Sequence, residues 1–560
     1  MVADGPDNNA SCRSASTGGY SIVGLTIVVI LAAFLRFAGI GRPEILLDES
    51  LSWYCQHHLL DWPADGPDKW RELTSIPYFF LLHVWARLFG DSPTALRSLS
   101  ALASLITVAL LARAASRSYD RTAAIICALL AAVSPLALWY AQLTRVYAFW
   151  AMVMALAGLL LFEAARGSRR STWAWYGLAL FAALCTHYFT LFGVPATLAC
   201  LLVAPNRART FKRWLTTHAI VGLAFTPVFF ALILPVASRS SGAWLADYWS
   251  RVNVAALVPM SLAAFIPAGE PPVFCHTLTW SLDALRAAGW GIAAAVAKRC
   301  GPIVLLLTVA GLALPRHRSD NTERRGGALA ALGYWVVLAV APLVLAWLYC
   351  FAARPNYLVG RYDLVCWPAW IVASALAIRL GAEGLLPRRP NLAAGTLTFV
   401  LLLVALVYHG GARVAGLTWG DREASPRRLV SAILQHAGPD AELVMFDDRW
   451  FLEYELHRQG FAGSIRSYPP RLDRQIGWRD IQSELADPQS LDREAAQLAD
   501  AIRRMVDQGR PVWLLLGNYE QEDDPRYRVD RHLFRALDDA NITLEIVDTS
   551  VGLARLRPVE

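Results

Sequence analysis

Two adjacent carboxylates, Asp48 and Glu49, are the strongest candidates for chemistry in this sequence. They follow an apolar run that ends near Arg36 and a short connection, Gly41-Arg42-Pro43. A carboxylate pair at the rim of a membrane is costly to keep unless it is paired or used, so such residues mark candidate functional sites. A structural role fits equally well, because acidic residues in the first turn of a helix through Trp53 would complement the helix dipole. The residues alone leave both interpretations open.

Other polar residues are expected on the same side of the apolar segments. They are Glu72, Gln142, Arg145, His187, Arg354 and Arg361. Carboxylates combined with arginines suit a reaction between an acceptor hydroxyl and a lipid-linked phosphate. A carboxylate accepts the proton, and guanidinium groups stabilise the phosphate that leaves. A His in this place is a site residue in some proteins and, more often, a hydrogen-bonded residue at a turn.

The composition indicates a polytopic α-helical membrane protein, since 56% of the 560 residues are hydrophobic and many apolar runs approach 20 residues. The net charge of +7 arises from Lys and Arg in short loops, which indicates membrane topology and not nucleic-acid binding. The nine cysteines form no CxxC pair, and no nucleotide-binding, GxSxG or HExxH motif occurs. The sequence therefore predicts no cofactor. A divalent metal is compatible with the chemistry but is not indicated.

Eleven apolar segments are predicted to cross the cell (inner) membrane. They lie near residues 20–40, 95–113, 122–140, 147–164, 172–186, 188–204, 214–236, 298–315, 328–350, 363–380 and 392–410. Basic clusters beginning at Arg113, Arg166, Arg207, Arg316 and Arg379 are expected in the cytoplasm, because short basic loops stay inside. Residues 1–19 then form a cytoplasmic tail, and residues 20–410 form the transmembrane domain.

Two long outer loops, residues 42–96 and 238–297, follow from this topology. Within the first loop, Pro77–Phe89 has about 13 residues where roughly 20 are needed to span, so it is predicted to lie on the membrane surface. The second loop carries Trp244, Tyr248, Trp249, Trp280 and Trp290. That pattern is typical of surface helices, which could line a lipid-substrate groove or form an aromatic belt.

Residues 411–560 have a different, more charged composition. Helical patterns near 426–436, 491–508 and 529–540 alternate with β-type runs at 442–446, 512–516 and 543–547. This alternation predicts a soluble α/β domain. With eleven spans and an amino terminus inside, the domain is expected to be extracytoplasmic.

Five motifs, in order, resemble the bacterial C-type membrane glycosyltransferases, which are related to protein O-mannosyltransferases and to the lipid A aminoarabinose transferase. The motifs are Leu35-Arg36-Phe37 with Leu47-Asp48-Glu49; Leu88-Phe89-Gly90-Asp91 with Arg97; Ser134-Pro135 with Tyr140-Ala141-Gln142 and Arg145-Val146-Tyr147; Thr186-His187-Tyr188-Phe189; and Gly360-Arg361-Tyr362. Together they cover most of residues 25–380. In one departure, Thr74-Ser75-Ile76-Pro77 stands where many relatives carry His-Pro-Pro or Glu-Lys-Pro, so no contact is carried over from that position.

The resemblance implies transfer of a hexose or pentose from a polyprenyl-phosphate donor to a hydroxyl of a cell-envelope glycan, lipid or protein on the outer face. Asp48 matches the family's catalytic carboxylate, acting as general base, and Glu49 is its neighbour. The implied substrate-binding residues are Arg36, Gln142, Arg145, Tyr147, His187 and Arg361. Of these, Arg145 and Arg361 match positions near the donor phosphate. The implied partners are the lipid-linked donor, the acceptor and membrane lipid, without nucleic acid.

A transporter or flippase of lipid-linked sugars is the alternative class. It would use the same charges to hold a phosphate, but it predicts internal repeats with broken helices in matching halves. No such repeat is found in the sequence. A non-catalytic assembly subunit would leave the Asp48-Glu49 pair without a task.

Overall fold

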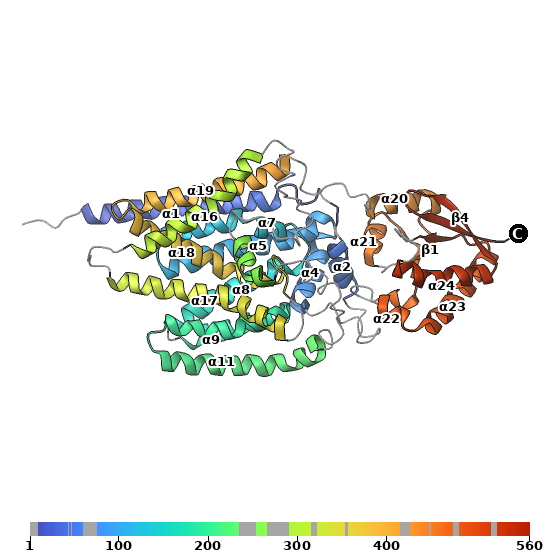
Figure 1. The fold of residues 1–560 in the computed structure, drawn as a ribbon, viewed down its shortest axis with the longest axis horizontal. Coiled ribbons are helices and arrows are strands. Elements are labelled where there is room, and N and C mark those ends of the chain that lie inside the picture. Colours follow the sequence, from blue (N-terminus) through green and yellow to red (C-terminus); the bar gives the residue numbers. More distant parts are fainter. Residues whose placement is uncertain are drawn as a thin grey trace, which may run out of the picture. The chain divides into compact units, whose positions relative to one another are not determined.

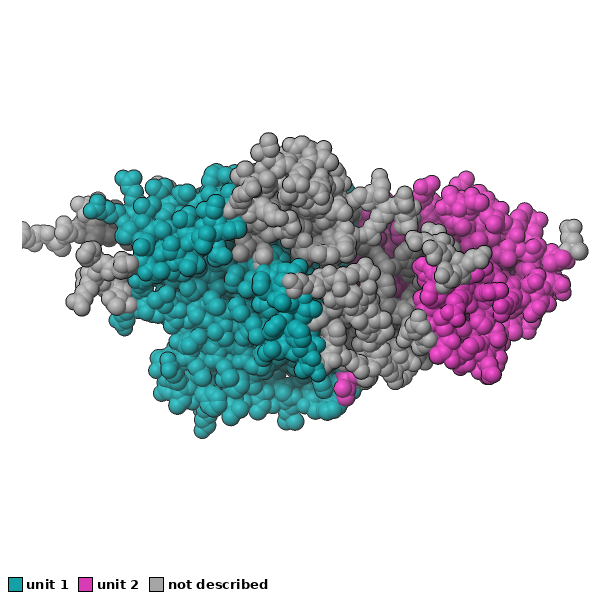
Figure 2. All heavy atoms as spheres, viewed as in Figure 1, with its two compact units in different colours: residues 1–43, 94–233, 242–420 teal, residues 44–93, 234–241, 421–560 magenta. Residues whose placement is uncertain are grey.

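The computed structural model describes most of the chain (Figure 1). The described residues are 9–42, 44–45, 47–59, 75–167, 169–234, 254–265, 291–314, 322–352, 357–414, 426–446, 450–473, 481–516 and 524–559. The backbone contacts divide the chain into two compact units (Figure 2). The first comprises residues 1–43, 94–233 and 242–420, and the second comprises residues 44–93, 234–241 and 421–560.

The described part of the first unit is helical. Its elements are α1 (Asn9–Phe37), α5 (Pro93–Ser118), α6 (Arg121–Val133), α7 (Pro135–Ala141), α8 (Val146–Arg166), α9 (Arg170–Thr186), η2 (Tyr188–Phe192), α10 (Gly193–Ala196), η3 (Thr197–Leu202), α11 (Arg207–Val228), η4 (Phe229–Ile233), η5 (Val254–Ala256), α14 (Leu257–Phe265), α16 (Gly291–Ala313), α17 (Thr322–Ala352), η6 (Tyr362–Val365), α18 (Trp367–Leu385) and α19 (Pro390–Val414). In Figure 1, α8, α9, α11 and α17 run beside one another.

Apolar side chains cover the outside of this unit. On α1, Ile27, Ile30 and Phe34 are all exposed and recur at helical spacing. On α11, Leu223 is 78% exposed. Side chains of this kind face water rarely but face lipid as a rule, so these helices have the surface expected of membrane-spanning segments.

Each of the eleven predicted apolar segments contains helix, and several are longer or more broken than predicted. Among the described residues, four helices are long and apolar enough to cross a membrane, or five if the bent pair α6 and α7 counts as one span. The predicted span near 122–140 is divided into two helices, because the chain bends by 58° between α6 and α7. The segment 188–204 is mostly 3₁₀-helix and not a regular α-helix. The total of eleven crossings stays a prediction.

Small residues let α16 and α18 approach closely. A Cβ atom at Gly311 of α16 would collide with the carbonyl group of Gly381 on α18, and a Cβ at Gly381 would collide with the Thr308 backbone. Close backbone contact through small residues is a common way for membrane helices to associate, since lipid offers no hydrophobic driving force between them.

The second unit contains two helices from the first predicted outer loop and an α/β domain. Its elements are α2 (Leu47–His57), α4 (Ile76–Phe89), α20 (Pro426–Ala437), β1 (Glu442–Met445), α21 (Trp450–Arg458), β2 (Ser464–Ser467), η7 (Pro470–Asp473), α22 (Ile481–Leu485), α23 (Pro488–Asp507), β3 (Val512–Leu515), α24 (Pro525–Asp539), β4 (Ile542–Asp548) and β5 (Leu553–Pro558). The sheet order is β2-β1-β3-β5-β4, with β1 parallel to β2 and β3, and β5 antiparallel to β3 and β4.

The alternating side chains of the central strands build two hydrophobic cores. Val444 and Leu514 point into the core formed with α23 and α24. Leu443 and Trp513 point into the opposite core, formed with α20 and α21. Both faces of the sheet are therefore covered by helices, as the alternation of helix and strand patterns predicted.

Helix α4 is the short apolar segment that was predicted to lie on the membrane surface. Its 14 residues extend about 21 Å, which is less than the roughly 30 Å of a hydrocarbon core. Phe80, Val84 and Leu88 form an exposed apolar stripe, while Phe79 and Leu82 are buried. This distribution suits a helix that packs on protein with one side and meets lipid with the other.

Candidate active site

The candidate catalytic carboxylates lie in the first turn of α2. Glu49 is fully buried and Asp48 is partly exposed. The Ser52 hydroxyl donates to the Asp48 backbone carbonyl at 3.2 Å, within the same helix. A first-turn position also favours negative charge electrostatically, so the helix geometry is compatible with both the catalytic and the structural interpretation.

Four of the predicted substrate-binding residues meet in one cluster of the first unit, which we call the arginine–tyrosine cluster: Arg145, Tyr147, His187 and Arg361. The Arg361 Nε atom donates to the Tyr147 hydroxyl oxygen at 2.5 Å. The Cζ atoms of Arg361 and Arg145 lie 5.5 and 6.0 Å from the centroid of the Tyr147 ring. Segments separated by more than 200 residues thus bring two guanidinium groups to one aromatic ring.

A tight turn before η6 presents Arg361. Gly360 has a φ of 76°, in the left-handed region that a residue with a Cβ adopts only with strain. Its N–H donates to the Asp363 carboxylate at 2.9 Å, and its carbonyl accepts from the Tyr140 hydroxyl at 2.5 Å. The buried Asp363 carboxylate therefore stabilises the turn. The conformation of the turn sets the position of the Arg361 Cα atom and the direction of its side chain.

His187 lies where α9 ends and η2 begins. Its Nδ1 atom accepts from the Phe189 backbone N–H at 3.2 Å, so the neutral ring carries its proton on Nε2. The ring stacks on Trp150, with centroids 4.2 Å apart, and on Tyr188, with centroids 4.9 Å apart. The geometry is compatible with both interpretations of His187. The residue caps η2, and its ring centroid lies 6.1 Å from that of Tyr147 in the arginine–tyrosine cluster.

Arg36 has a different setting from the other predicted binding residues. It is fully buried in the first unit, and its guanidinium donates to the carbonyl oxygens of Ala131 and Ala132 at 3.0 Å each. Pro135, four residues after Ala131, has no N–H to complete that helical hydrogen bond. The Arg36 guanidinium therefore replaces the N–H donor that Pro135 lacks, at the junction of α6 and α7. Its Nε atom also donates to the Ser104 hydroxyl at 2.8 Å.

Gln142 likewise contacts protein backbone. Its Nε2 atom donates to the carbonyl oxygens of Leu35 and Arg36, at 3.1 and 3.3 Å, near the end of α1. The last carbonyls of a helix have no partner within the helix, so the Gln142 amide serves as their cap. These contacts support architectural roles for Arg36 and Gln142, and a contact of either with substrate stays a prediction.

The arginine–tyrosine cluster has the chemistry of an anion site. Guanidinium groups form paired hydrogen bonds to phosphate oxygens, and the Tyr147 hydroxyl and the His187 Nε2–H add further polar atoms. A bound phosphate would be attracted by both positive charges. Arg145 is 8% exposed and Tyr147 is 3% exposed, so an anion at their polar atoms would be largely desolvated.

Three aromatic residues beside this cluster were not predicted as site residues, although two of them stand in the motifs: Trp150, Tyr188 and Tyr362. Trp150 follows Tyr147 by three positions on α8 and therefore shares its face, which is a signal that the sequence contains. Tyr188 and Tyr362 adjoin predicted site residues in the chain. The Tyr362 and His187 rings, which come from distant segments, have centroids 5.2 Å apart.

Some sequence predictions concern residues outside the described part of the structure. These are Glu72, Arg354, Thr74 of the Thr74-Ser75-Ile76-Pro77 segment, and the tryptophans and tyrosine named in loop 238–297. Among the described residues, no group of three His, Cys, Asp or Glu side chains is arranged to hold a metal ion. The prediction that the protein uses no cofactor stays a prediction.

Comparisons with known proteins show what the chain and its fold are similar to. The family model described as dolichyl-phosphate-mannose-protein mannosyltransferase matches residues 75–236. The structure of ArnT from Cupriavidus metallidurans in the apo state is similar, with 14% identity, a TM-score of 0.56 and coverage of 97% of this chain and 98% of that chain. ArnT bound to undecaprenyl phosphate gives 14% identity, a TM-score of 0.55 and coverage of 96% and 98%. The comparison with curated proteins gave no match.

The fold is therefore similar to that of ArnT, a C-type glycosyltransferase, and residues 75–236 match the model of the protein mannosyltransferases. This confirms the resemblance found in the motifs. With its lipid-type surface and this fold, the chain is a multi-pass membrane protein.

Proposed function

We propose that this protein transfers a sugar from a polyprenyl-phosphate donor to an acceptor hydroxyl on the outer face of the membrane. The observation that carries the proposal is the arginine–tyrosine cluster, a cationic and largely buried group within a C-type glycosyltransferase fold. ArnT, which shares the fold, has been crystallised with undecaprenyl phosphate. The acceptor is a glycan, lipid or protein of the cell envelope, and the transferred sugar is a hexose or a pentose.

In this reaction the acceptor oxygen attacks the anomeric carbon of the donor sugar. The bond from that carbon to the phosphate oxygen breaks, and polyprenyl phosphate leaves. Asp48 takes the proton of the acceptor hydroxyl, while Arg145 and Arg361 stabilise the charge that develops on the phosphate. An ordinary carboxylate suffices as base when the proton is lost late, as positive charge builds on the sugar.

The test is transfer by the purified protein in liposomes, with polyprenyl-phosphate sugars as donors and release of polyprenyl phosphate as the readout. Replacing Asp48 by Asn removes the proton acceptor but keeps the side-chain volume, so we expect a rate loss of roughly 10² to 10⁴. Glu49→Gln should cost less if Glu49 orients Asp48 and does not react.

Asp507→Asn is the control, because its carboxylate pairs with Arg503 on an exposed face of α23. It should leave the rate unchanged. Turnover near the wild-type rate by Asp48→Asn would refute the role of Asp48. Movement of the donor across the membrane without release of polyprenyl phosphate would favour the flippase alternative.

A further inference from the structure

Helix α2, which carries Asp48 and Glu49, packs on the α/β domain within the second unit. Glu49, Trp53 and His57 recur every four residues, so they share one stripe of α2. Trp53 is fully buried, and its ring meets Tyr454 of α21 edge to face, with centroids 5.4 Å apart. His58, at the end of α2, is 3.0 Å from the Glu453 carboxylate of α21.

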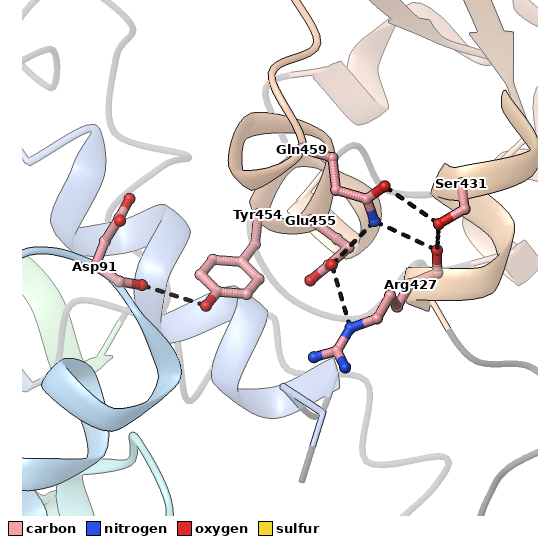
Figure 3. A network of polar contacts seen from close by, with 6 residues as sticks. All are labelled: Asp91, Arg427, Ser431, Tyr454, Glu455 and Gln459. Atoms are coloured by element: carbon pink, nitrogen blue, oxygen red, sulfur yellow. Dashed lines mark hydrogen bonds and ion pairs between the residues drawn. The ribbon is translucent and has the colours of Figure 1, made fainter. Parts of the chain in front are cut away.

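Asp91, in the short connection after α4, joins the two helices. Its carboxylate accepts from the Trp53 indole Nε1–H at 3.4 Å and lies 3.3 Å from His457 Nε2 on α21. Its backbone carbonyl accepts from the Tyr454 hydroxyl at 3.2 Å (Figure 3). One residue thus contacts both α2 and α21. Helix α4 adds a further tie, because His83 Nδ1 lies 2.7 Å from the Gln56 carbonyl of α2.

Helix α21 is itself fixed within its domain. On the side seen in Figure 3, Glu455 pairs with Arg427 of α20 at 3.5 Å and accepts from the Gln459 amide at 3.1 Å. The Ser431 hydroxyl of α20 donates to Gln459 at 3.2 Å. Leu452 and Leu456 enter the core shared with β1 and β3. Helix α21 therefore offers α2 a rigid support.

The titratable groups around His57 come from all the elements packed on it. They are His58 directly after α2, Asp91 after α4, and Glu453 and His457 on α21. Burial, followed by the neighbouring His58 and His457 rings, lowers the pKa of His57, and Glu453 and Asp91 partly offset this. The His57 ring is therefore neutral at pH 7, and its stacking on Trp53, with centroids 4.6 Å apart, needs no counter-ion.

We infer that Asp91, Tyr454 and His457 are positioning residues, which hold α2 so that its carboxylates keep the geometry needed for transfer. Trp53 is about one helical turn from Glu49. A displacement of the helix at Trp53 therefore displaces the Asp48 and Glu49 carboxylates by a similar distance. Misplacement of a reacting group by 1 Å costs up to about 10²-fold in rate. This inference rests on the proposed function.

The experiment compares Asp91→Ala and Tyr454→Phe with a matched control, Asp492→Ala. The control also breaks a contact between Asp and His, with His532 at 2.5 Å, but it lies between α23 and α24. Tyr454→Phe removes one hydroxyl and leaves the packing, so it remains informative if Asp91→Ala does not fold. Hydrogen exchange of amides 49–57, kcat and the donor KM are measured for each full-length protein.

We expect amides 49–57 to exchange roughly tenfold faster in Asp91→Ala, kcat to fall about tenfold or more, and the donor KM to stay within about twofold. The donor KM should stay nearly unchanged because Arg145 and Arg361, the proposed ligands of the donor phosphate, belong to the first unit. A general loss of structure would change KM and exchange throughout the chain. Asp492→Ala should match the wild type in all three measurements.

Faster exchange in α2 with unchanged kcat would overturn the positioning role and leave the proposed function standing. Unchanged exchange in α2 would overturn the positioning role as well, because the contacts would not hold the helix. Absence of transfer by the wild-type protein, with every polyprenyl-phosphate sugar tried, would overturn the proposed function and, with it, this inference.

Discussion

An arginine near the rim of a membrane can stabilise the protein framework or bind an anion, and its position in the sequence does not distinguish these two roles. Arg36 donates to two backbone carbonyls at a proline break, whereas Arg361 donates to a tyrosine beside a second arginine. Both stand in motifs that resemble those of the C-type glycosyltransferases. The motifs identified residues that the structure uses, but only the three-dimensional partners assign Arg36 to the framework and Arg361 to a candidate anion site.

Arg361 is therefore the sharper probe of donor binding. Arg361→Lys keeps the charge but loses the planar pair of donors, and it should already raise the donor KM. Arg361→Ala should lower kcat/KM by roughly 10- to 100-fold, the loss expected for a hydrogen bond to a charged group. Steady-state kinetics with varied donor concentration measures both effects.

Arg388→Lys is the control for this experiment, since Arg388 is exposed in the connection between α18 and α19. Normal donor KM and kcat in both Arg361 variants would show that Arg361 only anchors the turn before η6.

At the scale of elements, helix positions and the break at His187 were predictable, whereas the break between α6 and α7 was not. Apolar runs and basic loops located the helices, because burial in lipid requires both length and hydrophobicity. Proline was ambiguous: Pro227, Pro302 and Pro342 lie inside helices, whereas Pro135 begins a new one. At Pro135 a tertiary donor, Arg36, donates to the carbonyl that the proline leaves without its helical partner. Local sequence does not contain that information.

The turn at Gly360 gives an element-scale prediction. Gly360→Ala places a Cβ in the left-handed region, at a cost of about 1–2 kcal/mol, and should shift the start of the Arg361 side chain. We expect a higher donor KM together with a slightly lower unfolding temperature. Donor kinetics and thermal unfolding in detergent measure these effects.

Gly395→Ala is the comparison, because Gly395 lies inside α19 and a Cβ there meets no atom within 4 Å. That change should leave the donor KM unaltered and stabilise the helix slightly. A donor KM for Gly360→Ala equal to that of Gly395→Ala would contradict the role of the turn.

At the scale of the whole molecule, the class of fold and the α/β region were predictable, because composition changes sharply near residue 411. The grouping of residues 44–93 with residues 421–560 was not. Contacts such as Asp91 to Tyr454 join positions 363 residues apart, and neither periodicity nor composition carries that pairing. For the same reason the members of the arginine–tyrosine cluster were predicted as substrate-binding residues, but their contacts with one another were not.

Membrane orientation gives a prediction at this scale. Ser92→Cys and Thr549→Cys should react with an impermeant maleimide in intact cells, because outer loop 42–96 and residues 411–560 are expected outside. Ser171→Cys, beside the basic cluster that begins at Arg166, should react only after permeabilisation. The unsubstituted protein serves as the background, and among the cysteines whose burial the structure describes, all are buried except the half-buried Cys300. Labelling of Ser171→Cys in intact cells would reverse the orientation.

The contact between Asp91 and Tyr454 also has a consequence for how the protein is made. A ribosome adds about 5–20 residues per second, so the 363 residues between them take roughly 20 to 70 s to synthesise. During that interval Trp53 has no α21 to cover it. A truncated chain would reach the membrane with an exposed indole and an unsupported α2, the kind of surface that chaperones and proteases recognise. Synthesis of α21 thus also provides the support for the first candidate catalytic residues to emerge.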